Sequence, residues 1–306
     1  MRLFIIGNGF DIAHNLPTNF DPHFKKIANQ YELNNFWDIY QTQNNNIWSD
    51  FENSLAHPDF NALEEIFNGY SPDYYSERES DRNAIITQVD LNGNLTRSLY
   101  EFANNAEKKL MHTKPISKFE TKFTGNDLFI TFNYTHTLEK LYNIHKSRVL
   151  HIHGEVGENN LILGYPENSY SPEKYYFDVR RKGNGPFQEI EYQKYIDEKY
   201  EDGFFDYYTY TACCYLIKKT KSFSKQTQEK IFLSFLTNFI IQEIVILGHS
   251  CNIDFDYFKL LNKKLPNIKW FLIYHDNNTK NNMEKMIYQC GIKNYKKIED
   301  NVYFDK

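Results

Sequence analysis

Short apolar segments alternate with segments that can be helical, and this alternation constrains the fold of the chain more than any other feature. The apolar run at residues 3–6 stops at a Gly-Asn-Gly turn, and comparable runs end near Phe132 and Leu247. Parallel neighbours in a sheet need crossover connections, which helices usually supply. We therefore predict an α/β, Rossmann-like fold in which helices flank a mainly parallel sheet.

The length of 306 residues suits one sizeable domain that carries insertions. We expect the sheet core at about residues 1–20, 126–165 and 225–306. A helical insertion is expected at about 21–125, and a second insertion of loops and helices at about 166–224. In the final segment, we expect a helix at about 225–241.

The amino-acid composition limits which partners and which cellular compartment we expect. A net charge of -5 and a pI near 6.1 make nucleic acid an unexpected partner. None of the four cysteines has C-x-x-C spacing, so no metal is expected, and the pair Cys213-Cys214 is interpreted as core packing. Polar residues interrupt the most apolar stretch, 231–247, which favours a helix and a strand over a membrane span. With no signal peptide pattern, a reduced, cytoplasmic protein is expected.

The opening turn contains Gly7 and Gly9, with a helical segment after them. Glycine tolerates positive φ and lets a ligand approach the backbone, while the start of a helix offers free N–H groups to an anion. The pattern is typical of a phosphate cradle, but also of a tight strand-to-helix turn without a ligand. Both interpretations remain open at this point.

Polar residues follow the predicted strands at their carboxyl ends, where open α/β sheets bind ligands. Asn133 follows the strand that ends near Phe132, and it either caps the next helix or belongs to a site. Ser250 and Asp254 follow the strand at 243–247, and they either cap a helix or bind a nucleotide. Ser250 is a weak candidate nucleophile because the G-x-S-x-G elbow is absent.

Two histidines occur in a segment whose alternation is typical of a half-buried strand. This pattern predicts that Val149, His151 and His153 share one face. Two such histidines could bind a metal, but nearby spacing indicates no third ligand. We interpret His151 as a core residue. His153, beside Gly154 at the end of the strand, is a candidate general base.

A short helical pattern occurs at residues 48–52. Trp48 and Phe51 are spaced to share one helical face, and Asp50 is expected to point elsewhere. This spacing is typical of an amphipathic helix.

The motifs GNGFD, TFNYT, HIHG and GHS, with the later Asp254, occur in this order at the predicted strand ends. Together they resemble the AbiH family of bacterial abortive-infection proteins, whose W-x-x-x-E helix is matched by Trp48 and Glu52. The resemblance covers both ends of the chain. It implies a role in defence against phage.

A more distant resemblance is to the sirtuin-like NAD-binding fold, whose glycine–proline spacing is matched by Gly7, Gly9 and Pro17. By this resemblance, Asn133 of FNYT matches the catalytic Asn and His153 of HIHG the catalytic His. The chain differs from the sirtuin pattern by Asn8 in place of alanine, by Asp11 in place of serine, and by its lack of the zinc-binding cysteine pairs. The resemblance therefore implies NAD hydrolysis rather than protein deacylation.

Cleavage of the bond between nicotinamide and ribose passes through an oxocarbenium-like state that needs a positioned water and nearby negative charge. The resemblance implies that Asn133 orients the ribose or the water, that His153 accepts a proton, and that Asp11 lies beneath the ribose. The residues expected to bind the rest of NAD are Gly7, Asn8, Gly9, Phe10, Gly248, Ser250 and Asp254.

The leading hypothesis is a cytoplasmic antiphage effector that depletes NAD, with NAD as substrate and no metal. One alternative is a nucleotide sensor or toxin module that binds NAD or ADP-ribose without turnover. Another is a nuclease that uses His153 and Asp11. A phage-derived trigger and a second copy of the chain are further candidate partners, and no membrane association is expected.

Overall fold

A computed structural model describes residues 1–31, 36–40, 47–60, 93–167 and 207–304, together with residues 62, 63, 65, 86, 87 and 89. The chain forms two compact units. The first unit contains Met1–Ile27, Thr96–Leu163 and Gln226–Lys306, and the second contains Ala28–Leu95 and Gly164–Lys225. The side chains of Cys213 and Cys214, expected to pack in a core, lie outside the described part of the chain.

A six-stranded sheet forms the centre of the first unit, with the spatial order β3-β2-β1-β6-β7-β8 and every neighbouring pair parallel. Its strands are β1 (Arg2–Ile6), β2 (Leu128–Thr131), β3 (Val149–His151), β6 (Glu243–Leu247), β7 (Lys269–Tyr274) and β8 (Tyr295–Glu299). Counted along the chain, the order is 3-2-1-4-5-6, which is that of the Rossmann fold. The predicted α/β, Rossmann-like fold with a mainly parallel sheet is confirmed.

The central strands are buried on both faces. In β1, β2 and β6 almost every residue is buried, so these strands are continuous apolar runs rather than alternating ones. The edge strand β8 differs, because its sequence YKKIE is largely exposed and carries two lysines. Charged residues of this kind discourage pairing of a free edge with another chain.

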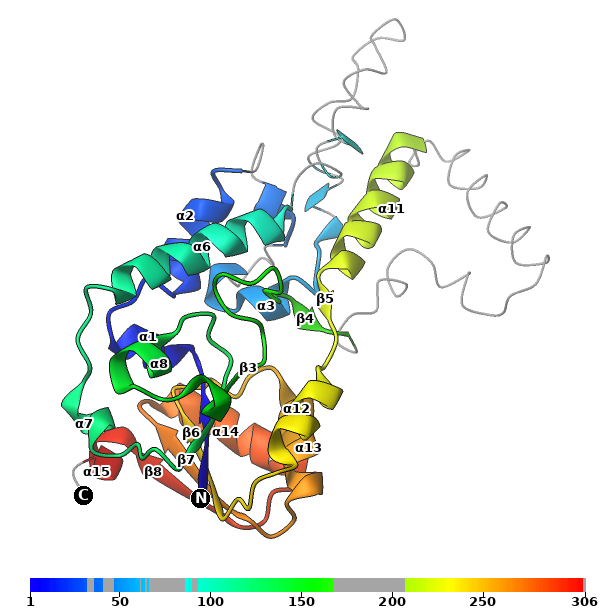
Figure 1. Ribbon diagram of the computed structural model, residues 1–306. Helices are drawn as coiled ribbons and strands as arrows, with labels where there is room; N and C mark the ends of the chain where they lie inside the picture. The colour runs from blue at the N-terminus through cyan, green and yellow to red at the C-terminus, as the bar shows by residue number, and fades with distance from the viewer. Residues whose placement is uncertain are drawn as a thin grey trace, which may run out of the picture. The chain divides into compact units, whose positions relative to one another are not determined.

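Helices cover both faces of the sheet (Figure 1). On one face lie α12 (Glu229–Leu236), α13 (Phe255–Lys264) and α14 (Asn277–Cys290). On the other face lie α1 (Asn8–Ala13), α7 (Ser117–Glu120), α8 (Thr137–Tyr142) and α15 (Asp300–Phe304). The sheet is thus the middle of three layers. The edge formed by the carboxyl ends of its strands lies between the two helical layers.

Further helices lie wholly or mainly within the first unit. They are η1 (Phe20–Phe24), α2 (Lys25–Ala28), α6 (Leu95–Leu110) and the short η4 (Lys146–Arg148). The side chains of Phe24 and Phe102 meet edge to face at 5.2 Å, which packs η1 against α6. None of the helices in the described ranges combines the length and the apolar character needed to cross a membrane.

The described part of the second unit contains η2 (Phe36–Tyr40), η3 (Ile47–Ser49), α3 (Phe51–Ser54), β4 (Tyr165–Pro166), α11 (Tyr207–Ser222) and β5 (Ser224–Lys225). The rings of Trp48 and Phe51 stack at 5.0 Å, but the two residues do not share one helix as predicted, because η3 ends at Ser49 and α3 begins at Phe51. Glu52 forms a buried ion pair with Lys225, with 2.8 Å between Oε1 and Nζ. This pair joins α3 to β5.

The helix expected at about 225–241 is shorter than the sequence pattern indicates. Ser224 and Lys225 pair with β4 as a strand, and α12 ends at Leu236. Beyond this point the Thr237 hydroxyl donates to the carbonyl oxygen of Leu233, a local bond that competes with further helix. The apolar residues after it therefore do not extend the helix.

Candidate active site at the carboxyl edge of the sheet

The loops after β1 and β6 meet where the strand order reverses, the place at which open α/β sheets bind ligands. The N–H of Gly9 donates to the carbonyl oxygen of Gly248 at 2.7 Å. A Cβ on Gly7 would lie 2.4 Å from the His249 Cα, and one on Gly248, whose φ is +65°, would lie 2.5 Å from the Phe10 nitrogen. The glycines are therefore needed for the two loops to pack against each other.

Asn133 lies just beyond β2 and is 6% exposed. Its side-chain amide donates to the carbonyl oxygen of Gly7 at 3.2 Å, and its own carbonyl accepts a hydrogen bond from His151 Nδ1 at 3.0 Å. Helix α8 begins at Thr137 with His136 at the N-cap position, so Asn133 does not cap it. Its amide is instead held at the carboxyl edge, next to the first glycine of the opening loop.

Asp11 is completely buried beneath this loop. Its carboxylate accepts hydrogen bonds from the hydroxyl groups of Thr135 and Thr137, and Asn133 supplies a further one. Burial raises the pKa of Asp11 to about 6, although the three hydrogen bonds act to lower it. In this arrangement Asp11 fixes α1 to the segment between β2 and α8, and so positions Asn133.

The two histidines of the HIHG motif point to opposite faces, so the prediction that they share one face is wrong. Strand β3 ends at His151, and a turn carries the chain through His153. His151 reaches α8, with 2.9 Å between its Nε2 and Glu139 Oε1. His153 packs edge to face on Phe132 at 5.1 Å, on the side of α13. The turn breaks the two-residue period on which the prediction depended.

His153 is 4% exposed, and its Nε2 lies 3.5 Å from Asp254 Oδ1. That nitrogen has no hydrogen-bond partner among the described residues. Asp254 is buried, has φ +66° and occupies the N-cap position of α13, but its side chain makes no capping bond there. The capping interpretation of this carboxylate is therefore not supported, and the carboxylate is directed at the histidine.

The other predicted site residues are distributed around this group. Ser250 is exposed at the β6 junction, and the Asn8 side chain donates to the carbonyl oxygen of Thr18 at 2.7 Å. Phe10 lies apart, because its ring is buried 4.9 Å from that of Phe119 in the hydrophobic core. The sequence analysis missed His249, whose ring packs on Phe132 at 4.6 Å and which is part of the GHS motif.

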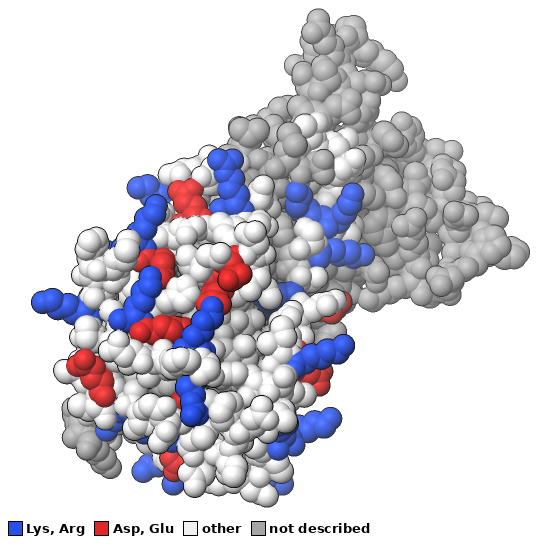
Figure 2. Space-filling model, viewed as in Figure 1, with Lys and Arg blue, Asp and Glu red and all other residues white. Residues whose placement is uncertain are grey.

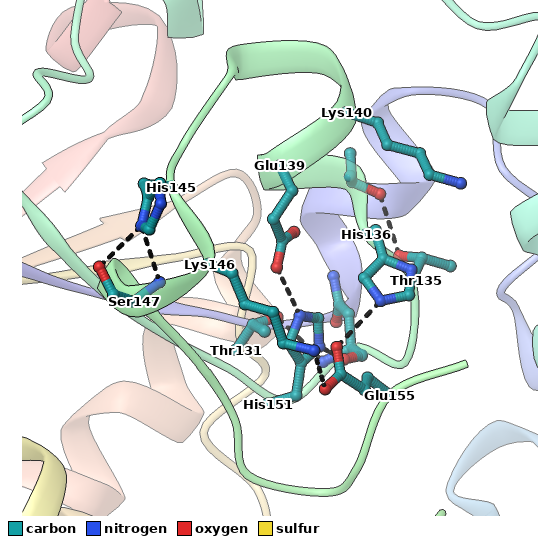
Figure 3. Close-up of polar contacts among 12 residues, drawn as sticks. Thr131, Thr135, His136, Glu139, Lys140, His145, Lys146, Ser147, His151 and Glu155 are labelled. Atoms are coloured by element: carbon teal, nitrogen blue, oxygen red, sulfur yellow. Dashed lines mark hydrogen bonds and ion pairs between the residues drawn. The ribbon is translucent and has the colours of Figure 1, made fainter. Parts of the chain in front are cut away.

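A second polar cluster lies on the α8 side of the sheet (Figure 3). His136 Nδ1 is 2.9 Å from Glu107 Oε1, and His136 Nε2 is 3.0 Å from Glu155 Oε2. The hydrogen bond with Glu107 raises the pKa of His136. Burial acts to raise the pKa of Glu107, but hydrogen bonds from His136 and Lys140 lower it to about 2.

This cluster borders a groove of about 730 Å³ whose lining includes Glu107, His136, Glu139, Lys140 and Lys146. Figure 2 shows acidic and basic side chains interspersed on the described part of the same face. The sequence pattern did not indicate the cluster, because its hydrogen-bonded partners are separated by up to 33 residues along the chain. No spacing pattern connects them.

Comparison with known proteins gives one match. A family model described as Bacteriophage abortive infection AbiH matches residues 3–274. This range includes Asp11, Asn133, His153 and Asp254 at the carboxyl edge of the sheet. Neither the curated proteins nor the solved structures contain a significant match.

Proposed function

The chain belongs to the AbiH family of bacteriophage abortive infection proteins, and on this premise we propose that it acts by hydrolysing NAD at the bond between nicotinamide and ribose. The proposal places NAD across the loops that follow β1 and β6. Two features support this placement: the Rossmann strand order and the polar residues at the point where the order reverses.

The observation that carries the proposal is the buried Nε2 of His153, which lacks a hydrogen-bond partner among the described residues and faces Asp254 at 3.5 Å. Buried polar atoms are normally hydrogen-bonded, and a catalytic role is one explanation for an exception. A carboxylate close to an imidazole stabilises the cation that forms when the imidazole takes a proton. His153 is thus placed to act as a general base.

In the proposed reaction, water attacks the anomeric carbon of the ribose as the bond to nicotinamide breaks. The electron pair of that bond leaves with nicotinamide, the proton of the water passes to His153, and ADP-ribose is the second product. The oxocarbenium-like state needs an oriented sugar and water rather than a covalent intermediate. Asn133 supplies this orientation through its amide, and Asp11 holds the Asn133 segment in place.

The test is release of nicotinamide from NAD by the purified full-length protein, followed by liquid chromatography. His153→Ala and Asn133→Ala should each reduce the rate by roughly 10²–10⁴-fold. The matched control is His275→Ala, since His275 also follows a parallel strand, β7, but its side chain is 62% exposed. This variant should retain the wild-type rate.

Two results would contradict the proposal. If both site variants hydrolyse NAD as fast as the wild type, the residues are wrongly assigned. If calorimetry shows that the wild type binds NAD tightly but no nicotinamide is formed, the protein is a nucleotide sensor and not a hydrolase. Circular dichroism of each variant separates loss of activity from loss of fold.

A further inference from the structure

We propose that His136, His151 and Glu155 bind a divalent transition-metal ion of the zinc type, independently of any NAD hydrolysis. One ligand atom from each of the three residues lies within 4.8 Å of the others. Figure 3 shows the three side chains converging from β3 and from the segments before α8 and after β3. Two imidazoles and one carboxylate form a ligand set that zinc accepts, with a fourth position free for water or another group.

The second ring nitrogen of each histidine already has the partner that metal sites require. His136 Nδ1 is hydrogen-bonded to Glu107 at 2.9 Å, and His151 Nδ1 donates to the carbonyl oxygen of Asn133 at 3.0 Å. Bonds of this kind from a histidine to a carboxylate or a backbone carbonyl fix the ring and direct the other nitrogen at a metal. Here they leave Nε2 of both rings directed into the cluster.

The charge of the cluster favours a cation. When a metal ion holds Nε2 of both histidines, each ring is neutral. The carboxylates of Glu107, Glu139 and Glu155 then outnumber the ammonium groups of Lys140 and Lys146, which pair with Glu107 and Glu155. Oε2 of Glu139 is buried and has no hydrogen-bond partner among the described residues. Glu139, whose Oε1 lies 2.9 Å from His151 Nε2, is therefore a candidate fourth ligand.

Metal binding must replace two existing hydrogen bonds, those from Nε2 of His136 to Glu155 and from Nε2 of His151 to Glu139. Ligands of a tetrahedral zinc ion lie about 3.3 Å apart, so no separation between the ligand atoms, which all lie within 4.8 Å of one another, has to close by more than about 1.5 Å. Lys146, which holds Glu155 Oε1 at 2.9 Å, is 69% exposed and can move away. The groove lined by His136 and Glu139 gives an ion access from solvent.

Calorimetric titration of the full-length protein with zinc chloride, after dialysis against a chelator, tests this site. One ion should bind per chain, and metal analysis of protein purified without chelator should find the same stoichiometry. Glu107→Gln, which removes only the outer partner of His136, should weaken binding by roughly 10–100-fold. Glu155→Gln and His136→Ala, which remove ligands, should weaken it further, and His275→Ala should leave it unchanged.

Cobalt substitution provides a readout that a purely structural role of these residues would not change. Absorption bands of tetrahedral cobalt should be present in the wild type and in His275→Ala, and absent in Glu155→Gln. The proposal is wrong if zinc binding is not saturable at one ion per chain. It is also wrong if Glu155→Gln and His136→Ala, both folded by circular dichroism, bind zinc as tightly as the wild type.

Discussion

Single residues at the carboxyl edge are held by the protein before any ligand binds. Asn133 is fixed by Gly7, His151 and Asp11, whereas Nε2 of His153 lies 3.5 Å from Asp254 and has no hydrogen-bond partner among the described residues. A positioning group that is already bonded loses little freedom when substrate arrives. The amide of Asn133 is therefore rigidly held, whereas Nε2 of His153 has no hydrogen-bond partner among the described residues.

Asp11 gives a prediction about pH and stability. Its pKa is about 6 in the folded protein against an ordinary value of 3.8, so the folded state binds more protons than the unfolded state between these pH values. The stabilisation is complete below pH 3.8 and is lost as the pH rises through 6. Asp11→Asn cannot ionise, so the free energy of unfolding of the wild type should fall by about 2 kcal/mol relative to this variant between pH 4 and 7.

Urea denaturation of the two proteins, followed by circular dichroism, measures this difference. Asp276→Asn is the matched control, since the backbone N–H of Thr279 lowers the pKa of Asp276. For this variant the pH dependence of the unfolding free energy has the opposite sign, because the wild type should lose stability relative to Asp276→Asn as the pH falls. If the unfolding free energies of wild type and Asp11→Asn change in parallel with pH, the pKa of the buried Asp11 carboxyl is not raised.

At the scale of elements, the contact between the loops after β1 and β6 organises the site. Gly248 and Gly291 both have φ +65°, but a Cβ on Gly248 would lie 2.5 Å from the Phe10 nitrogen, whereas one on Gly291 would meet open space. Gly291→Ala should cost about 1–2 kcal/mol of unfolding free energy, from the left-handed backbone alone. Gly248→Ala should cost about 1–3 kcal/mol more, from the clash.

Chemical denaturation of these two glycine variants separates the contributions of conformation and of packing. Equal losses of unfolding free energy in the two variants would mean that the loops can separate without cost. In that case the glycines would serve only the approach of a ligand, which is one of the two interpretations that the sequence leaves open for the opening turn.

The elements that could be predicted are those with long, continuous patterns. The bounds of β6, Glu243–Leu247, could be predicted from its apolar run, because a strand buried on both faces needs apolar residues along its length. Strand β3 could not be bounded, because the alternation of its sequence continues past His151 although the backbone turns there. The opposite orientations of His151 and His153 follow from that turn, and no sequence period indicates it.

At the scale of the whole molecule, the sequence indicated parallel strands but not their spatial order. The crossover connections require helices without specifying on which side of β1 each new strand is added. The order places the ends of β1, β2, β3 and β6 next to one another, and so gathers Asn133, His153 and Asp254. The cluster around His136 could not be predicted, because Glu107 comes from α6, far from the histidine in sequence.

We propose that this AbiH protein protects cells by depleting NAD through His153. The most direct test is the NAD content of infected cells that express wild type, His153→Ala or the control His275→Ala, measured through one cycle of phage growth. We predict that NAD falls before lysis in cells with the wild type or the control, and that it stays constant with His153→Ala, which no longer protects. Protection by the wild type without any fall in NAD would contradict the proposal that NAD depletion protects the cells.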